Sequence, residues 1–407
     1  MIVVYTGETP PDSFSKSLFL AGPSPRKATD PNWRTEAIEM LEELGYDGVV
    51  FSPVWRDTPP DPFDYSKQVS WEKKYLNMSD QIVFWVPRDL EKLPGFTTNV
   101  EFGLWVKSGK ILLGSPEGAP KMDYLNWWAV QEGVPVHATL MGILTGTLNK
   151  LESGVLRTGG EREVPLHLWK KPEFETWLEA QKEAGNRLDG AELVWAFRAG
   201  RNKTLTVLWS LKVNVWVEAE KRAKTNEVVV FRPPTTSVVV FSRPPLSDQN
   251  DWTLDSEIML VREFRSPAAT EDGMVHEVPG GSSWKEGAGI ETARTELIEE
   301  SGLDLPADRF RYVGARQVAA TLCGHQSHVY AVELTAAEML SMKWLGDAQF
   351  GNTQDTEITY VEVRTLREIL KEGLLDWSNL GMIFQTLEDG TPPSVELVDN
   401  SPPKGMV

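Results

Sequence analysis

The stretch QIVFWVPRDLEKLPGFTTNVEFG, residues 81–103, indicates how the first part of the chain folds. Its apolar run at 81–87 is typical of a strand buried on both faces, and the segment from 98 to 108 fits a helix. A strand followed by a helix is the repeating unit of a parallel sheet covered by helices. Ligands bind at the carboxyl ends of the strands in such folds, which is where Glu101 is expected.

The same alternation runs through residues 1–150, which we predict to form one α/β domain with helices on both faces of a parallel sheet. Further strands are predicted at 17–22, 47–53, 110–116 and 135–140, and further helices at 30–45 and 69–78. The helix at 30–45 has Asp30 as its expected N-cap and Pro31 at its first position.

The rest of the chain divides into two segments of different character. Residues 151–225 are interpreted as a mostly helical connector, with a helix at 171–185 and a stretch at 208–224 that fits either a strand or a helix. Residues 226–407 hold several strand-like runs between Gly, Pro and Asp turns, with helical stretches after them. This pattern predicts an α+β sandwich.

Composition limits the classes of function. A chain of 407 residues with net charge -18 is not expected to bind nucleic-acid backbones non-specifically, although anionic small molecules remain possible substrates. Its single cysteine, Cys323, fits a reducing cytoplasm. We expect no association with membranes, because no apolar run approaches the length of a membrane span.

A second informative stretch is ETARTELIEESGLDL, residues 291–305. On a helix, Glu296, Glu299 and Glu300 are neighbours on one face, where carboxylates repel each other. No lysine stands at that spacing to balance them. A divalent cation such as Mg2+ or Mn2+ would explain the arrangement, because hard cations take oxygen ligands.

This stretch and the glycines before it resemble the Nudix hydrolase family. Counting from Gly281 places the following residues on the positions of the family's box: Glu296, Leu297, Glu299, Glu300, Gly302 and Leu303. The resemblance implies a Nudix-type sandwich that holds Mg2+ or Mn2+ through the three glutamates, uses Glu299 in catalysis and Gly281 in substrate binding, and hydrolyses a nucleoside diphosphate linkage.

The match departs from the family at two positions, and this leaves alternatives open. Gly287 stands where the family has a glutamate, and Thr295 stands where it has an arginine, with Arg294 one residue early. A one-residue shift turns a helical side chain by about 100°. The second hypothesis is therefore a module that binds a nucleotide such as ADP-ribose without cleaving it, and regulates the first domain.

Three other residues of this segment are candidates of lower rank. Glu357 fits either a further base or metal ligand, as the family often has, or an exposed strand carboxylate. His325 and His328 are interpreted as ordinary polar residues, since their odd spacing on a strand points them to opposite faces.

Glu101 itself has two interpretations. It could complete a capping box with Thr98 as N-cap, or it could be a nucleophile toward an anomeric carbon at the edge of the sheet. Glu72 and Asp80 are the other acids near the third strand. The loop GPSPRK, residues 22–27, is either a solvated loop or a phosphate site, because backbone amides and basic side chains meet at its turn.

The order and spacing of four motifs resemble the nucleoside 2-deoxyribosyltransferase family and its N-glycosidase relatives. These motifs are LFLAGP (18–23), FSP (51–53), SDQIVFWVP (79–87) and TTNVEFG (97–103). The resemblance implies a flavodoxin-like sheet with Glu101 as nucleophile and Glu72 near the base. Asp80 begins a buried strand and is therefore interpreted as structural. The position of the family's second aspartate is occupied by Gly95 in this chain, so that role is unfilled. A neighbouring subunit often completes the site in this family, which implies a homo-oligomer.

Together these observations predict a bifunctional enzyme of nucleotide metabolism whose small-molecule substrates are nucleosides or nucleotides. The first domain would transfer or hydrolyse an N-glycosidic bond, and the last would cleave a diphosphate linkage. The residues expected to bind substrate in the first domain are Gly22, Ser24, Arg26, Lys27, Thr98 and Asn99.

Overall fold

Two units make up the chain in the computed structural model, Met1–Arg232 and Pro233–Val407. The structure describes residues 1–25, 32–57, 62–245, 251–282, 289–352 and 357–388. The expected boundary at 150 falls inside the first unit, because the segment after it packs against the same unit through its own helices and strands. Each unit is described by itself below.

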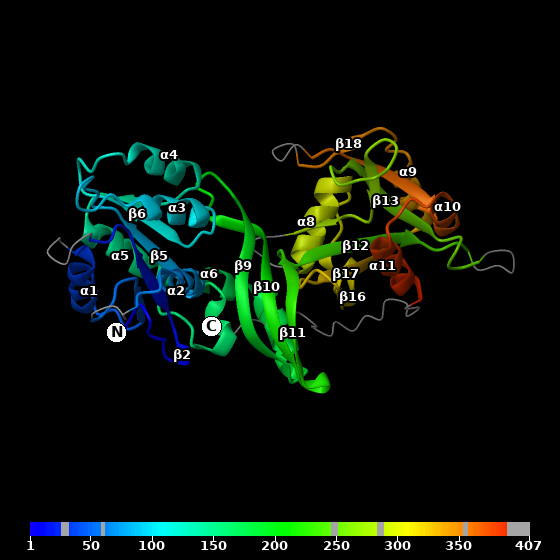
Figure 1. Cartoon of the computed structure of the whole chain (residues 1–407). Coiled ribbons are helices and arrows are strands. Elements are labelled where there is room, and N and C mark those ends of the chain that lie inside the picture. Colours follow the sequence, from blue (N-terminus) through cyan, green and yellow to red (C-terminus); the bar gives the residue numbers. More distant parts are fainter. Residues whose placement is uncertain (26–31, 58–61, 246–250, 283–288, 353–356, 389–407) are drawn as a thin grey trace. The chain divides into compact units, whose positions relative to one another are not determined.

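A six-stranded parallel sheet forms the first layer of the first unit (Figure 1). Its strand order is β1-β4-β3-β5-β6-β7. Its strands are β1 (Ile2–Tyr5), β3 (Ser17–Ala21), β4 (Val49–Ser52), β5 (Gln81–Trp85), β6 (Ile111–Gly114) and β7 (Val136–His137). A separate short pair joins β2 (Ser13–Phe14) to β8 (Arg157–Thr158). The predicted parallel sheet is confirmed.

Helices cover both faces of this sheet. They are α1 (Trp33–Glu43), α2 (Tyr65–Met78), α3 (Phe96–Trp105), α4 (Asp123–Gln131) and α5 (Leu140–Leu151). Alternate residues of one strand face opposite sides, so Phe19 packs with α2, α3 and α4, whereas Leu18 and Leu20 pack with α1 and α5. This two-sided burial explains why the strands are continuous apolar runs, and the arrangement agrees with a flavodoxin-like domain.

The strand order creates a switch point at β3. From β3 the chain passes through α1 to β4 on one side, and from β4 it passes through α2 to β5 on the other side. The carboxyl ends of β3 and β5 therefore flank a crevice of the kind in which ligands of open α/β sheets bind. α1 and α3 both begin at this edge, and their first residues can reach the crevice.

The start of α1 differs from the expectation. Asn32 is the N-cap, and its side chain accepts a hydrogen bond from the Arg34 N–H, whereas the expected cap, Asp30, lies outside the described residues. Asn and Asp are equally good N-cap residues, so the sequence alone is compatible with a helix that starts after Asp30 or after Asn32.

The expected helical connector at 151–225 is wrong for its second half. After α6 (Leu166–Trp169) and α7 (Pro172–Glu183), the chain forms an antiparallel sheet of β9 (Arg187–Ala199), β10 (Leu205–Val217) and β11 (Arg222–Phe231). Trp209, Leu211 and Val213 point to one side of β10 and pack on α6 and α7. Apolar residues at every second position are typical of a strand with one buried face. The helices α6 and α7 cover that face.

The second unit has a mixed sheet with the order β16-β17-β12-β13-β19-β18, to which β14 and β15 add through β13 and β12. Its strands are β12 (Thr235–Ser242), β13 (Glu257–Phe264), β14 (Met274–Glu277), β15 (Gly280–Gly281), β16 (Arg311–Arg316), β17 (Ser327–Glu333), β18 (Gln349–Phe350) and β19 (Thr359–Thr365). β12 pairs with β17 in parallel, and the other pairs are antiparallel.

Helices lie on both faces of this mixed sheet (Figure 1). One face packs on α8 (Ile290–Ser301) and α9 (Ala336–Lys343), and the other packs on α10 (Leu366–Glu372) and α11 (Trp377–Glu388). The strand and helix pattern therefore produces a layered α+β unit, as the sequence predicts.

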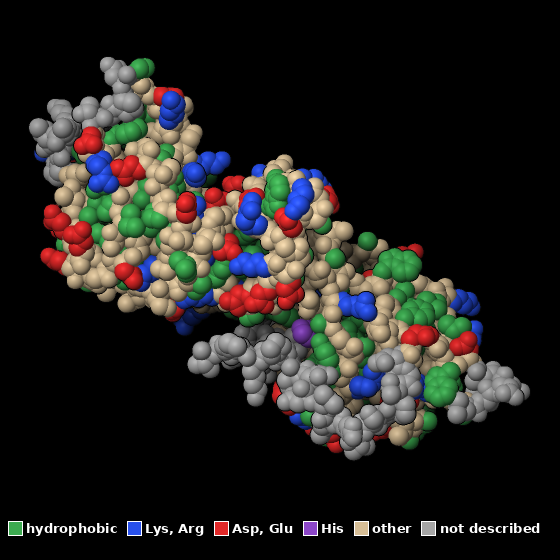
Figure 2. All heavy atoms as spheres, turned by 90° about the horizontal axis from the view of Figure 1, so that it is seen from below, with side chains coloured by type: hydrophobic (Ala, Val, Ile, Leu, Met, Phe, Trp, Pro, Cys, Tyr) green, Lys and Arg blue, Asp and Glu red, His purple; other side chains and the backbone are tan. Residues whose placement is uncertain are grey.

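The surface of the described chain carries many acidic groups. Figure 2 shows Asp and Glu side chains distributed over both units on the face seen there, in keeping with the net charge of -18. Among the described helices, none combines the length and apolar character needed to cross a bilayer.

Candidate functional site

Glu101 lies inside helix α3 and not in a capping box. Gly95 is the N-cap of α3, with φ 64°, and no side chain caps the helix. Thr98 is therefore the third residue within the helix, which makes the capping-box interpretation of Thr98 and Glu101 wrong. Glycine suits this cap because φ near +64° strains other residues.

Three charged side chains from three helices interact at the carboxyl edge of the first sheet: Arg34 of α1, Glu72 of α2 and Glu101 of α3. The pKa of Glu101 is raised to about 7, first by burial and then by the nearby Glu72, while the charge of Arg34 acts to lower it. Burial also raises the pKa of Glu72, against hydrogen bonding from Gln68 and the charge of Arg34. Two carboxylates that share one arginine favour a proton on one of them.

Arg34 is the residue of this site that sequence reasoning missed. Its side chain is 1% exposed, and burial lowers its pKa to about 10 while Glu101 and Glu72 raise it. The guanidinium donates to the carbonyl oxygens of Leu20 (3.0 Å) and Gly22 (2.7 Å). A signal existed in the sequence, because Arg34 stands among the apolar residues of its helix, where a charge must have a partner.

The loop after β3 is organised around Arg34. Arg34 also donates to the Pro23 carbonyl and the Ser24 hydroxyl, each at 3.3 Å. Gly22 has φ 150°, and a Cβ at this position would lie 2.1 Å from the carbonyl oxygen of Trp85, so only glycine fits. Gly22 and Ser24 thus lie at the predicted edge, whereas Arg26 and Lys27 lie outside the described residues.

The other predicted residues of the first unit separate into two groups. The Thr98 hydroxyl is buried and has no hydrogen-bond partner among the described residues. Asn99 is exposed, and its side-chain oxygen accepts from Arg88 at 2.5 Å. Asp80 forms a buried ion pair with Arg157 at 2.6 Å, so its predicted structural role is confirmed.

A cavity of about 420 Å³ opens at the same edge of the sheet, beside the carboxyl ends of β5, β6 and β7. Its wall combines two indole rings, Trp33 and Trp85, with the polar side chains of Asn32 and Glu36. An aromatic wall with a few polar groups suits a small organic ligand.

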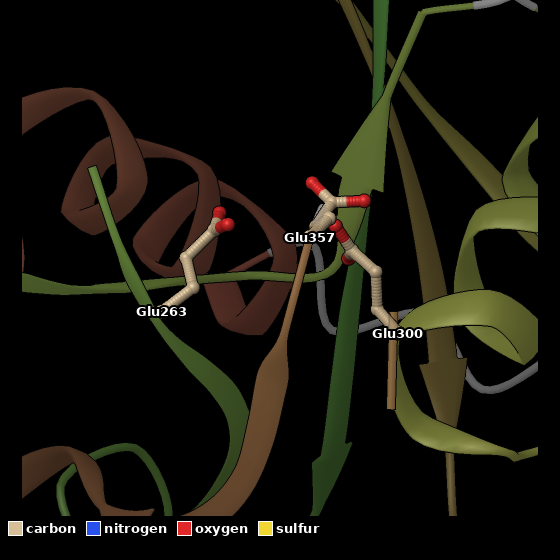
Figure 3. A group of neighbouring side chains, drawn as sticks. All are labelled: Glu263, Glu300 and Glu357. Atoms are coloured by element: carbon tan, nitrogen blue, oxygen red, sulfur yellow. The ribbon is translucent and has the colours of Figure 1, made fainter. Parts of the chain in front are cut away.

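The second unit brings together three carboxylates from distant parts of the chain. Figure 3 shows Glu300 of α8 and Glu357, which precedes β19, side by side, with Glu263 of β13 pointing toward them. Their nearest oxygens all lie within 4.8 Å of one another. Burial raises the pKa of Glu263 to about 7 and that of Glu300 well above its ordinary value, and the neighbouring carboxylates add to both effects.

Glu296 extends this carboxylate group on the same helix. Burial raises its pKa to about 7, with further contributions from Glu299 and Glu357. A Cβ on Gly281 would lie 2.4 Å from the Glu296 carboxylate, so the glycine makes room for it. Arg265 is the cation near the group, at 2.5 Å from Glu263 and 3.5 Å from Glu357.

The structure groups the predicted ligands differently from the sequence. Glu300 accepts a hydrogen bond from the Gly280 N–H at 2.8 Å and belongs to the close group, whereas Glu299 is exposed and outside it. Glu357 lies in the group, which favours the ligand interpretation over the exposed carboxylate. Glu263 was missed, although its alternation with Met259 and Val261 places it on the α8 face of β13.

Arg294 does not reach the carboxylate group by any described contact. It donates to the Leu305 carbonyl at 2.9 Å and pairs with Glu291 at 3.2 Å. The other departure from the box, Gly287, lies outside the described residues. His328 contacts the Tyr312 hydroxyl at 3.2 Å, and neither His328 nor His325 belongs to a cluster of described residues whose geometry could hold a metal ion.

Comparison with known proteins bears on the first unit. A family model described as "Nucleoside 2-deoxyribosyltransferase like" matches residues 15–119, which include Arg34, Glu72 and Glu101. A comparison with curated proteins found no match.

Proposed function

We propose that the first unit breaks the N-glycosidic bond of a nucleoside or nucleotide, with the Glu101 carboxylate as nucleophile. The observation that carries this proposal is the group formed by buried Arg34 and the half-buried Glu72 and Glu101, at the carboxyl edge of a parallel sheet. The family match over residues 15–119 supports the same chemistry for this segment.

In the proposed reaction, a Glu101 oxygen forms a bond to the anomeric carbon of the sugar. The bond from that carbon to the base nitrogen breaks, and its electron pair leaves with the base. The pKa values of Glu72 and Glu101 are both raised by burial, so the pair holds one proton, and when Glu101 attacks as the carboxylate Glu72 carries this proton and donates it to the departing base. Water or a second base then takes the sugar, and the Glu101 carboxylate is released.

Arg34 has a positioning role in this proposal. It holds the loop of Gly22 and Ser24 through hydrogen bonds, and its charge favours the ionised, nucleophilic form of Glu101. Arg34 lowers the pKa of Glu101 and Glu72 raises it. The acid limb of the pH profile reports the ionisation of Glu101, so it tests whether the three groups are arranged as described.

The test is a nucleoside and nucleotide panel with product identification, followed by pH profiles of kcat/KM on the best substrate. Glu101→Gln is expected to abolish release or exchange of the base. Arg34→Met is expected to move the acid limb to higher pH and Glu72→Gln to lower pH, because each removes one influence on Glu101. Shifts in the same direction, or a fully active Glu101→Gln variant, would contradict the assignment.

A second proposal concerns the carboxylate group of the second unit, which we infer to hold a divalent cation in an enzyme that hydrolyses a nucleoside diphosphate linkage. The donor set fits the ion: Glu263, Glu300 and Glu357 offer only oxygen atoms, and these three carboxylates meet beside a single arginine, Arg265, among the described contacts. Oxygens bound to one Mg2+ lie at most about 4.2 Å apart, so a small side-chain movement closes the group. A bound Mg2+ or Mn2+ would neutralise phosphate charge and activate water.

The competing hypothesis for this unit is a nucleotide sensor of the ADP-ribose type that regulates the first unit. The contacts of Arg294 with Leu305 and Glu291 favour it, because they leave the arginine role of the resembled family unfilled. Mn2+ titration combined with an assay for phosphate release from dinucleotide diphosphates separates the two. Metal-dependent cleavage supports the enzyme, and nucleotide binding without cleavage supports the sensor.

A further inference from the structure

The cavity of about 420 Å³ in the first unit borders the same loop as the charged group of the proposed reaction. Trp33, which lines the cavity, and Arg34, which belongs to the charged group, both donate hydrogen bonds to the Pro23 carbonyl, at 3.1 and 3.3 Å. The Arg34 guanidinium also lies over the Trp33 ring, 4.7 Å from its centre. One ligand can therefore contact both the cavity and the charged group.

The cavity and the two carboxylates of the charged group belong to opposite faces of the sheet. Trp33, Trp85 and Leu140 of the cavity wall are part of the core between the sheet and the helices α1 and α5. Glu72 and Glu101 are carried by α2 and α3, which pack on the other face. A ligand that contacts both must extend across the carboxyl edge of the sheet.

The proposed reaction determines which end of the substrate lies on each side. The departing base must contact Glu72, its proton donor, and therefore lies on the α2 side. In a nucleotide, the base and the 5′ phosphate are attached on opposite sides of the ring oxygen of the sugar. With the anomeric carbon at Glu101, the 5′ substituent therefore extends away from Glu72 and toward the cavity.

The lining of the cavity suits an aromatic group better than a phosphate. Among the described residues of its wall, Glu36 is the only one with a charged side chain, and a carboxylate repels a phosphate. The wall has two indole rings, against which a nucleobase can pack, and Glu36 can accept a hydrogen bond from an amino group of that base. The volume also lies within the range of about 300–1,000 Å³ that is usual for pockets of organic ligands.

We propose that the substrate of the first unit is a dinucleotide joined by a 5′–5′ diphosphate, and that the cavity holds its second base. The inference rests on the glycosidic chemistry proposed above and names the substrate class of that site. The first base is released beside Glu72, and the diphosphate passes the turn at 22–24. There the Ser24 hydroxyl accepts a hydrogen bond from Arg34 and can donate its own proton to a phosphate oxygen.

The test is calorimetric titration of the full-length Glu101→Gln variant, which leaves the substrate intact. The probes are the symmetrical dinucleoside 5′,5′-diphosphates of adenine, guanine, cytosine and uracil, each compared with its 5′-mononucleotide. At least one dinucleotide is expected to bind tenfold or more tightly than its mononucleotide. Adding Ala138→Trp, whose indole would fill the cavity, should reduce this preference at least tenfold. Ala180→Trp is the matched control, because Ala180 is exposed on α7 and does not line the cavity.

The affinities decide the proposal. Equal affinity for every dinucleotide and its mononucleotide overturns it, and so does binding of none of the probes. A preference that Ala138→Trp leaves unchanged overturns it as well, because the dinucleotide is then held elsewhere in the chain, and so does a preference that Ala180→Trp also removes. Where Ala138→Trp fails to fold by circular dichroism, Glu36→Ala replaces it at an exposed position. It should weaken dinucleotide binding at least threefold, and an unchanged affinity refutes the proposal.

Base release is measured separately on the wild-type chain with the same probes. Its absence would contradict the glycosidic function, whereas the affinities test only the place of the second base. Failure of the proposed reaction and failure of the cavity as a binding site are thus told apart by different measurements.

Discussion

Replacing Glu101 by Gln is expected to stabilise the protein at alkaline pH while it removes the proposed activity. The pKa of Glu101 is about 7 in the folded chain, because the side chain is buried beside Glu72, against an ordinary value of 4.5. Between pH 4.5 and about pH 7, Glu101 therefore keeps its proton in the folded state and has lost it in the unfolded state. Stability should fall as pH rises from about 4.5 to about 7, and stay low above it.

The size of this effect follows from the two pKa values. Each pH unit between 4.5 and about 7 costs about 1.4 kcal/mol of unfolding free energy, and the partial solvent contact of Glu101 reduces the total to about 2–3 kcal/mol. Gln cannot ionise and avoids this cost. For a unit of this size the gain corresponds to roughly 5–10 °C in melting temperature above pH 8.

The assay is thermal unfolding of wild type and variant from pH 5 to pH 9, with base release measured in parallel. Glu101→Gln should melt like the wild type at pH 5 and above it at pH 8.5. Glu39→Gln is the matched control, since Glu39 is exposed on α1, and it should follow the wild type throughout. Equal or lower melting of Glu101→Gln at pH 8.5 would refute the reasoning that a buried, repelled carboxylate occupies this site.

Four other substitutions test the structure of the two units. Asp80→Asn should lower the unfolding free energy in urea by about 3–5 kcal/mol, because it leaves the fully buried Arg157 charge without its partner, and a loss below about 1 kcal/mol would contradict this. Gly22→Ala should reduce soluble yield or base release, since its Cβ would lie 2.1 Å from a backbone oxygen, and an unaffected variant would show that the loop can move. Glu300→Gln should weaken Mn2+ binding at least tenfold in calorimetry, whereas Glu299→Gln should change it little, because Glu299 lies outside the close carboxylate group. A larger loss of Mn2+ affinity in Glu299→Gln than in Glu300→Gln would favour the ligand set predicted from the helix alone.

The sequence by itself determined the local elements of the chain. Apolar runs such as 81–87 carry the information for strands, because side-chain periodicity acts over a few residues, whereas the start of α3 was predicted at Thr98 and lies at Gly95. Glu101 could be placed at the edge of the first sheet for the same reason. The run at 208–224 was ambiguous, because its strand identity depends on the helices α6 and α7 that its apolar face covers.

Only the tertiary structure decided which charged groups meet. Glu263 comes from a strand, Glu300 from a helix and Glu357 from the segment before another strand, and no local pattern relates residues so far apart in the chain. Arg34 and Glu101 likewise interact because α1 and α3 begin at one edge of a folded sheet. The pKa of a carboxylate depends on burial and on neighbouring charges, and chain folding creates both, so the chemistry of the two sites could not be read from spacing alone.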